Sequence, residues 1–151
     1  FMVVGSDLVE SRDGGATWPT AFTEPGRQGR IPFLQVNNRD GRNFDLWFGD
    51  TQLFRIPCTT PANTTSTARR CPDAASWVNA QAGGHWDVGD IAFGGGAVRC
   101  PILFSNDGGV YFNTRTGANC HDPVWEQPTT TVTAMWLWDM AGRIRTAANE
   151  E

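Results

Sequence analysis

The segment 85–90 reads His-Trp-Asp-Val-Gly-Asp and is the richest cluster of side chains that can bind a ligand. It directly precedes a short apolar stretch. An imidazole and two carboxylates suit a hydroxyl-rich ligand or a cation, and the indole of Trp86 offers a flat face for stacking. In the structural alternative, Asp87 and Asp90 cap turns while His85 bonds a neighbouring backbone carbonyl. Both interpretations stay open, so His85, Trp86, Asp87 and Asp90 are candidate ligand-binding residues.

A hydrolytic role would need two carboxylates on opposite sides of the scissile bond of a glycan, about 5 to 10 Å apart. The candidates are Asp50, Asp87, Asp90 and Asp107. Asp50 and Asp107 fall in expected hairpin turns, where aspartate is common for conformational reasons. No catalytic residue is therefore assigned, and the sequence indicates no particular cofactor or metal ion.

Three similar hairpins are the elements that would position these residues. Each has an apolar strand, a short turn with an aspartate and a second apolar strand. The hairpins cover residues 2–11, 46–56 and 102–112. Each is followed by a loop and then a tryptophan: Trp18, Trp77 and Trp125. Further strands are expected at 31–37, 89–94 and 132–139. The pattern predicts an all-β fold of four-stranded antiparallel sheets.

The turn after the first hairpin, from Ser11 to Trp18, reads Ser-Arg-Asp-Gly-Gly-Ala-Thr-Trp. The side chains of Ser11 and Asp13 can accept hydrogen bonds from nearby backbone N–H groups, and the glycine pair permits positive φ. Trp18 is expected to fold back under the turn as a hydrophobic plug. All eight positions fit S-x-D-x-G-x-T-W, so the stretch resembles the Asp-box (BNR repeat) of sialidase, xyloglucanase and sortilin-type β-propellers. The resemblance implies structural roles for Ser11, Asp13, Gly15, Thr17 and Trp18.

The segment 84–113 extends the resemblance. It has a His-x-Asp loop, a strand and a hairpin that reads Asn-Asp-Gly-Gly-Val-Tyr, which is similar to a pattern of Asp-box propellers. It departs from that pattern where Gly89 and Asp90 replace a frequent second histidine. In propellers the loop before the innermost strand lies near the central channel, where ligands bind. The resemblance thus implies a channel position for the segment 85–90.

Phe54-Arg55-Ile56-Pro57 resembles the sialidase motif whose arginine binds the substrate carboxylate. Here Arg55 alternates with apolar neighbours on the second strand of a hairpin. Sialidases also use two more arginines and a nucleophilic tyrosine, and the one tyrosine of this chain, Tyr111, falls inside an expected strand. Most tryptophans have structural explanations, which leaves Trp86 and Trp47 as stacking candidates.

The expected strands amount to about three propeller blades, and the chain is predicted to be one propeller segment. Its blade pieces are expected at about 1–24, 25–82, 83–128 and 129–151. The first piece lacks an inner strand and the last supplies only one. Ring closure usually takes about four to eight blades. We therefore expect either part of a longer propeller or a homo-oligomer in which two copies close one ring.

Four cysteines, Cys58, Cys71, Cys100 and Cys120, lack the C-x-x-C spacing of zinc or redox sites, which favours structural disulfides in an oxidising compartment. The pair 58–71 brackets a polar loop, and 100–120 would join one strand to the return of its hairpin, so these two pairings are predicted. A disulfide across such a short loop contributes about 3 kcal/mol in the chain-entropy model. Asn63 opens a glycosylation sequon in the polar loop, which fits export from a eukaryotic cell.

The net charge of −4 argues against a nucleic-acid partner, whose phosphates attract basic proteins. No apolar run is long enough for a membrane span. Together these features predict a secreted or cell-surface module that binds a glycan or a protein. The alternative is part of a glycoside hydrolase of the xyloglucanase or sialidase kind, and a third interpretation is a pure assembly role.

Overall fold

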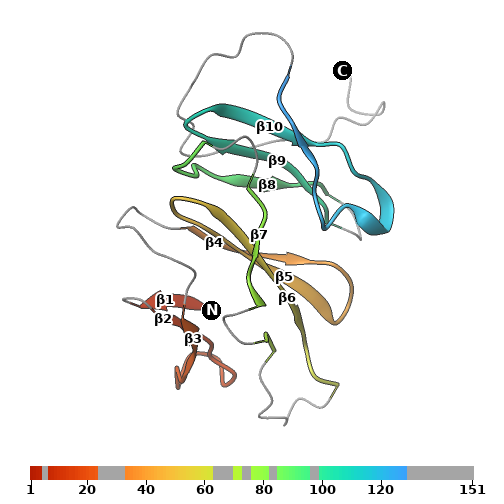
Figure 1. Ribbon diagram of the computed structural model, residues 1–151. Helices are drawn as coiled ribbons and strands as arrows, with labels where there is room; N and C mark the ends of the chain where they lie inside the picture. The colour runs from red at the N-terminus through yellow and green to blue at the C-terminus, as the bar shows by residue number, and fades with distance from the viewer. Residues whose placement is uncertain are drawn as a thin grey trace, which may run out of the picture. The chain divides into compact units, whose positions relative to one another are not determined.

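The computed structural model describes residues 1–4, 7–23, 33–62, 70–72, 76–81, 85–95 and 99–128 (Figure 1). These residues form mainly β-strands, with a short 3-10 helix at Gly117–Asn119. The predicted all-β fold with four-stranded antiparallel sheets is confirmed. The chain forms two compact units, Phe1–Gln81 and Ala82–Glu151. In the described part of the chain, no helix has the length and apolar character needed to cross a membrane.

The first unit begins with a three-stranded antiparallel sheet. Its strands are β1 (Met2–Val4), β2 (Asp7–Val9) and β3 (Thr20–Thr23), in that spatial order. The hairpin predicted over 2–11 is therefore present, and the turn from Ser11 to Trp18 connects β2 to β3. As expected from the sequence, this sheet has one strand fewer than the other two among the described residues.

The turn from Ser11 to Trp18 is built from local hydrogen bonds. Ser11 Oγ accepts from Gly15 N–H at 2.7 Å, and Asp13 Oδ1 accepts from Thr17 N–H at 2.9 Å. Gly14 and Gly15 both have positive φ, at 71° and 97°, as the tight reversal requires. The indole N–H of Trp18 donates to the carbonyl of Gly15 at 2.9 Å. Trp18 thus folds back onto the turn as predicted, but its side chain stays exposed instead of buried as a plug.

The second sheet of this unit has four strands in chain order. They are β4 (Phe33–Asn38), β5 (Asn43–Gly49), β6 (Leu53–Thr59) and β7 (Val78–Asn79). The central strand β5 is buried at every position from Phe44 to Gly49, because both of its faces are covered. Gly49 allows the ring of Phe33 to cross it, since a Cβ at Gly49 would lie 2.1 Å from Phe33 Cε1.

An apolar core joins the two sheets of the first unit. Its buried members are Leu8, Phe44, Leu46, Ile56, Cys58 and Cys71. Leu8 comes from the three-stranded sheet and the others from β5, β6 and the loop after β6, so the alternating apolar positions of the strands meet at one interface. The rings of Phe1 and Phe44 also pack across it, with centroids 6.0 Å apart.

A buried ion cluster reinforces this contact at the end of β2. Glu10 is almost fully buried, and its Oε1 lies 3.0 Å from Arg70 Nε and 3.2 Å from Arg12 Nε. Two guanidinium groups compensate the desolvated carboxylate, which is the condition for a buried charge to be tolerated. Glu10 therefore links the first sheet to the base of the loop after β6.

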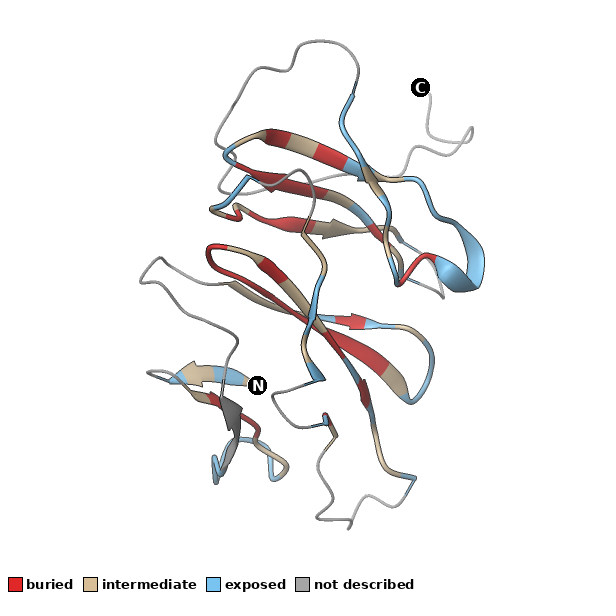
Figure 2. Ribbon diagram, in the orientation of Figure 1, coloured by how far each residue is buried: buried red, intermediate tan, exposed pale blue. Residues whose placement is uncertain are grey.

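The second unit contains one four-stranded antiparallel sheet. Its strands are β8 (Ile91–Phe93), β9 (Pro101–Asn106), β10 (Gly109–Asn113) and β11 (Trp125–Glu126), again in chain order. Phe104 is at the centre, with ring centroids 5.7 Å from Tyr111 and 5.4 Å from Trp125. In both four-stranded sheets the buried residues concentrate on the two middle strands (Figure 2).

Both disulfides join the pairs predicted from the sequence. Cys58 is bonded to Cys71 and Cys100 to Cys120, and the described residues include no free cysteine. Each disulfide restrains the loop between the third and fourth strands of its sheet. The strand predicted at 132–139, the glycosylation sequon at Asn63 and most of the polar loop after Cys58 lie outside the described residues.

Candidate binding site

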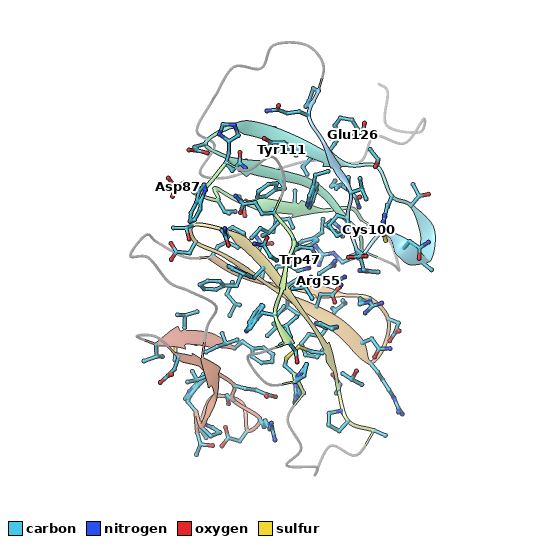
Figure 3. The ribbon with its side chains drawn as sticks, in the orientation of Figure 1. Trp47, Arg55, Asp87, Cys100, Tyr111 and Glu126 are labelled. Atoms are coloured by element: carbon cyan, nitrogen blue, oxygen red, sulfur yellow. A yellow bond between two sulfur atoms is a disulfide. The ribbon has the colours of Figure 1, made fainter. Side chains whose placement is uncertain are left out.

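The candidate segment 85–90 runs beside the end of β9 and continues the pairing that β8 begins. Gly89 N–H donates to the carbonyl of Ser105 at 3.0 Å, and Ser105 N–H donates to the carbonyl of Asp90 at the same distance. The hydroxyl of Ser105 accepts a further bond from Asp90 N–H at 3.0 Å. Figure 3 shows Asp87 on this segment and Tyr111 on β10. Pairing with β9 therefore fixes the backbone of the segment.

His85 faces an aspartate of the neighbouring hairpin turn. Its Nδ1 lies 3.5 Å from Asp107 Oδ1, and the side chains of His85 and Asp107 are 55% and 43% exposed. The imidazole packs directly over Gly108, where a Cβ would lie 2.4 Å from the ring. A side chain at position 108 would therefore displace the imidazole, and the histidine and aspartate present one polar pair to solvent.

The buried side-chain amide of Asn106 connects the backbone at His85 to the turn that carries Asp107. Asn106 is fully buried; its Nδ2 donates to the carbonyl of His85 at 3.3 Å and its Oδ1 accepts from Gly108 N–H at 2.8 Å. The phenol of Tyr111 lies beside the same amide. Burial raises the pKa of Tyr111, a hydrogen bond with Asn106 works in the opposite direction, and the charge of Asp107 raises the pKa further. The phenol is thus neutral at physiological pH.

The other candidates of the segment differ in accessibility. Trp86 is 49% exposed, and its carbonyl accepts a bond from Asp107 N–H at 3.4 Å. Asp87 has a positive φ of 66°, a left-handed conformation that aspartate tolerates better than most residues. Asp90 is buried and pairs with β9 through its backbone. The exposed part of the site thus consists of His85, Trp86 and Asp107, and Asp87 is half-buried.

Asp107 is the site residue that the sequence interpretation underrated. The Asn-Asp-Gly-Gly turn explains an aspartate at this position without any ligand, so Asp107 was expected to serve the turn. The available signal was the glycine at 108, because a residue without a side chain leaves room for a ring to cross the turn. In the structure the ring that crosses is the imidazole of His85.

The arginine of the sialidase-like motif lies in the first unit, on a polar face of the β4–β7 sheet. Arg55 is opposite Trp47 in the register of β5 and β6, and Trp47 is fully buried. The carboxylate of Asp45, two positions before Trp47, lies 3.8 Å from Arg39 Nη1. Burial raises the pKa of Asp45 to about 6, although the charges of Arg55 and Arg39 act against the shift. Trp47 is therefore an interior residue, and the charge of Arg55 favours the ionised form of the buried Asp45 carboxyl.

The remaining carboxylate candidate is also structural. Asp50 is buried in the β5–β6 turn, where its N–H donates to the carbonyl of Gln52 at 3.2 Å. Among the described residues, the one group with the make-up of a metal site is Cys100, Cys120 and His121, and its two sulfurs are bonded to each other.

The comparisons with known proteins yield no relative. No protein-family model matches the chain, no curated protein matches it, and no solved structure matches it.

Proposed function

We propose that the chain is a segment of an Asp-box β-propeller and that each of its three sheets is a blade. Support comes from the repeated strand order and from the Ser11–Trp18 turn, whose hydrogen bonds use the side chains that the Asp-box pattern specifies. A closed ring then needs further blades, from a second copy or from additional chain. The native mass measured by light scattering, set against the mass of the denatured chain, separates these two sources. A strictly monomeric particle of this 16.5 kDa chain would contradict a ring made of two copies.

We further propose that the segment 85–90 and the hairpin turn at Asp107 bind a glycan. The observation that carries this proposal is the half-exposed side chain of Trp86, which follows His85 in the chain and whose backbone carbonyl accepts a bond from Asp107 N–H, the partner of His85. An exposed aromatic face packs against the apolar face of a sugar ring, and the polar pair offers a donor and an acceptor to its hydroxyls. The buried amide of Asn106 preorganises the arrangement, which lowers the entropic cost of binding.

Binding to a panel of immobilised plant and animal glycans tests this function. The variant Trp86→Ala is expected to weaken binding about tenfold or more, since a truncated aromatic anchor usually costs over 1 kcal/mol. Trp18→Ala is the matched control, because Trp18 is also an exposed tryptophan but belongs to the other unit. Equal loss in both variants, or no bound glycan at all, would contradict the proposal, and a bound protein from a defined panel would redirect it to a protein ligand.

A glycoside hydrolase is the second candidate function. It is favoured by the carboxylates of Asp87 and Asp107. Asp87 directly follows Trp86, and Asp107 directly follows the end of β9, which pairs with the segment 85–90. Incubation with the same glycans, followed by analysis of released sugars, distinguishes hydrolysis from binding. Turnover that disappears in Asp87→Asn or Asp107→Asn would establish an enzyme, whereas binding without turnover supports the module.

We also propose that the protein works outside the cytosol. Two disulfides in a chain of this size are typical of secreted and cell-surface proteins. Partition of the full-length natural product between cell lysate and medium tests this location.

A further inference from the structure

A buried histidine lies against one of the two disulfides. The ligand atoms of Cys100, Cys120 and His121 are all within 4.8 Å of one another. Cys120 is fully buried and His121 is 4% exposed, so the imidazole is held inside the loop after β10. A histidine in this position is not needed for a structural disulfide, which requires only its two cysteines.

We propose that Cys100, Cys120 and His121 form a redox-gated zinc site. In the oxidised protein the two sulfurs are bonded to each other, and after reduction by a dithiol the two thiolates and the imidazole bind one Zn²⁺ ion. Two thiolates and one imidazole are donors that Zn²⁺ prefers, and a water molecule would complete the tetrahedron. The proposal is independent of glycan binding, because it uses none of the residues of that site.

The reduction needs two electrons, which the dithiol supplies. One thiolate of the dithiol attacks Sγ of Cys100, which is the more accessible cysteine, and the S–S bond breaks with its electron pair passing to Sγ of Cys120. The second thiol of the reagent then displaces Cys100, so the reagent leaves as a cyclic disulfide and both cysteines become thiols. Each thiol releases its proton when its sulfur binds Zn²⁺.

The surrounding loop keeps the three ligands together without the disulfide. Asn113 Nδ2 donates to the carbonyl of Cys120 at 3.0 Å and to the carbonyl of Pro101 at 2.9 Å. One amide thus ties the backbone at Cys120 to the residue that follows Cys100. The two sulfurs need only move apart enough to admit an ion with Zn–S bonds of about 2.3 Å.

The other disulfide lacks this arrangement and supplies the internal control. Neither Cys58 nor Cys71 belongs to a group of three close His, Cys, Asp or Glu ligands in the part of the chain that the structure describes. Reduction of Cys58–Cys71 is therefore expected to create two thiols without a zinc site.

The test uses Co²⁺ as a spectroscopic probe for Zn²⁺. The Cys58→Ala/Cys71→Ala variant of the whole chain is reduced with a dithiol, freed of the reagent without oxygen and titrated with Co²⁺. We expect one Co²⁺ per chain, with thiolate-to-cobalt charge-transfer and tetrahedral d–d bands that Zn²⁺ abolishes. The oxidised protein is expected to show no such bands. His121→Ala in the same background should weaken Co²⁺ binding at least about tenfold.

Three results would overturn the proposal. They are the absence of a cobalt–thiolate band in the reduced protein, equal Co²⁺ affinity with and without His121, and a band that persists in Cys100→Ala/Cys120→Ala with the other pair intact. Far-UV circular dichroism follows folding throughout. A reduced protein that loses its β spectrum and does not regain it with Zn²⁺ also counts against the site, because the ligands must be held by the fold.

Discussion

The loop that leads to the last strand of a sheet is held in two different ways in this protein. Between β2 and β3 it is the Ser11–Trp18 turn, fixed by hydrogen bonds between residues at most four positions apart. Between β10 and β11 it spans 114–124 and is held by the Cys100–Cys120 disulfide and the half-buried side-chain amide of Asn113. The first device is local and exposed, and the second depends on contacts distant in sequence.

The difference shows how one position in a repeated sheet can be stabilised by unrelated chemistry. The amide of Asn113 makes four bonds: it donates to Pro101 and Cys120, and its Oδ1 accepts from the N–H groups of Arg115 and Val124. The carboxylate of Asp13 instead accepts from Thr17 and Ser11, all within its own turn. Long loops thus use one residue or disulfide as an anchor, while the short turn is self-contained.

The largest effect is expected from removing the disulfide of the long loop. Cys100→Ala/Cys120→Ala should lower the free energy of unfolding by about 3 kcal/mol, because the cross-link closes a loop with a sequence separation of 20. Chemical denaturation under non-reducing conditions measures this loss. Cys58→Ala/Cys71→Ala, with a separation of 13, should lose a similar amount. If the free energy of unfolding falls in Cys58→Ala/Cys71→Ala but hardly changes in Cys100→Ala/Cys120→Ala, Asn113 is the main anchor of the loop 114–124.

A second prediction concerns the buried Asp45, whose pKa is raised, whereas the pKa of the exposed Asp13 is lowered. Burial raises the pKa of Asp45 from 3.8 to about 6, so the folded protein holds a proton that the unfolded chain releases. The contribution of Asp45 to the free energy of unfolding is fully present below pH 3.8 and is lost as the pH rises through 6. The loss is on the order of 3 kcal/mol. The pH dependence of unfolding between pH 4 and 7 should therefore be flatter in Asp45→Asn than in the natural sequence. Parallel curves for the two proteins would contradict the raised pKa.

The third prediction separates the two functions of the Asn113 amide. Asn113→Ala removes four hydrogen bonds and is expected to cost about 2 kcal/mol, since each bond contributes about 0.5 to 1.5 kcal/mol and the exposed ones contribute least. Asn113→Asp keeps the two accepted bonds but turns a carboxylate oxygen toward the carbonyl oxygens of Pro101 and Cys120, which repel it, so its loss at neutral pH should be at least as large. Thermal unfolding of both variants measures the difference. A smaller loss in Asn113→Asp than in Asn113→Ala would mean that the two accepted bonds carry most of the effect.

The same contrast explains what the sequence could predict. The hairpins, the Ser11–Trp18 turn and both disulfides follow from short-range patterns, because the alternation of apolar residues, the glycine pair and the loop lengths are visible locally. The partnership of His85 with Asp107 and the anchor at Asn113 depend on which backbone a side chain meets in three dimensions. A one-dimensional pattern does not contain that information.

Burial was the second kind of information missing from the sequence. Trp86 is a candidate ligand-binding residue and Trp47 a further candidate for stacking, yet Trp47 is fully buried and Trp86 is half exposed. Trp47 lies in a central strand covered on both faces, whereas Trp86 precedes an edge strand of its sheet. The position of a strand within a sheet decides this outcome, and residue type does not reveal it.

The smallest effect is expected at the exposed turn. Hydrogen bonds from the side chain and the backbone N–H of Thr17 lower the pKa of Asp13 to about 2, so the folded state favours the ionised carboxylate. Its contribution is present above the unfolded value of 3.8 and is lost as the pH falls through 2. Asp13→Ala should lower the midpoint of thermal unfolding at pH 6, by less than Asn113→Ala does, because solvent screens an exposed interaction.

The pH dependence of that difference decides whether the charged bonds are responsible. The midpoints of Asp13→Ala and the natural sequence should converge between pH 4 and pH 2, whereas those of Asn113→Ala should stay separated, since an amide does not titrate. If the unfolding midpoints of Asp13→Ala and the natural sequence still differ at pH 2, the turn depends on the hydrogen bonds of the neutral Asp13 side chain and not on its charge. The turn would then resemble the long loop, in which neutral hydrogen bonds anchor the chain.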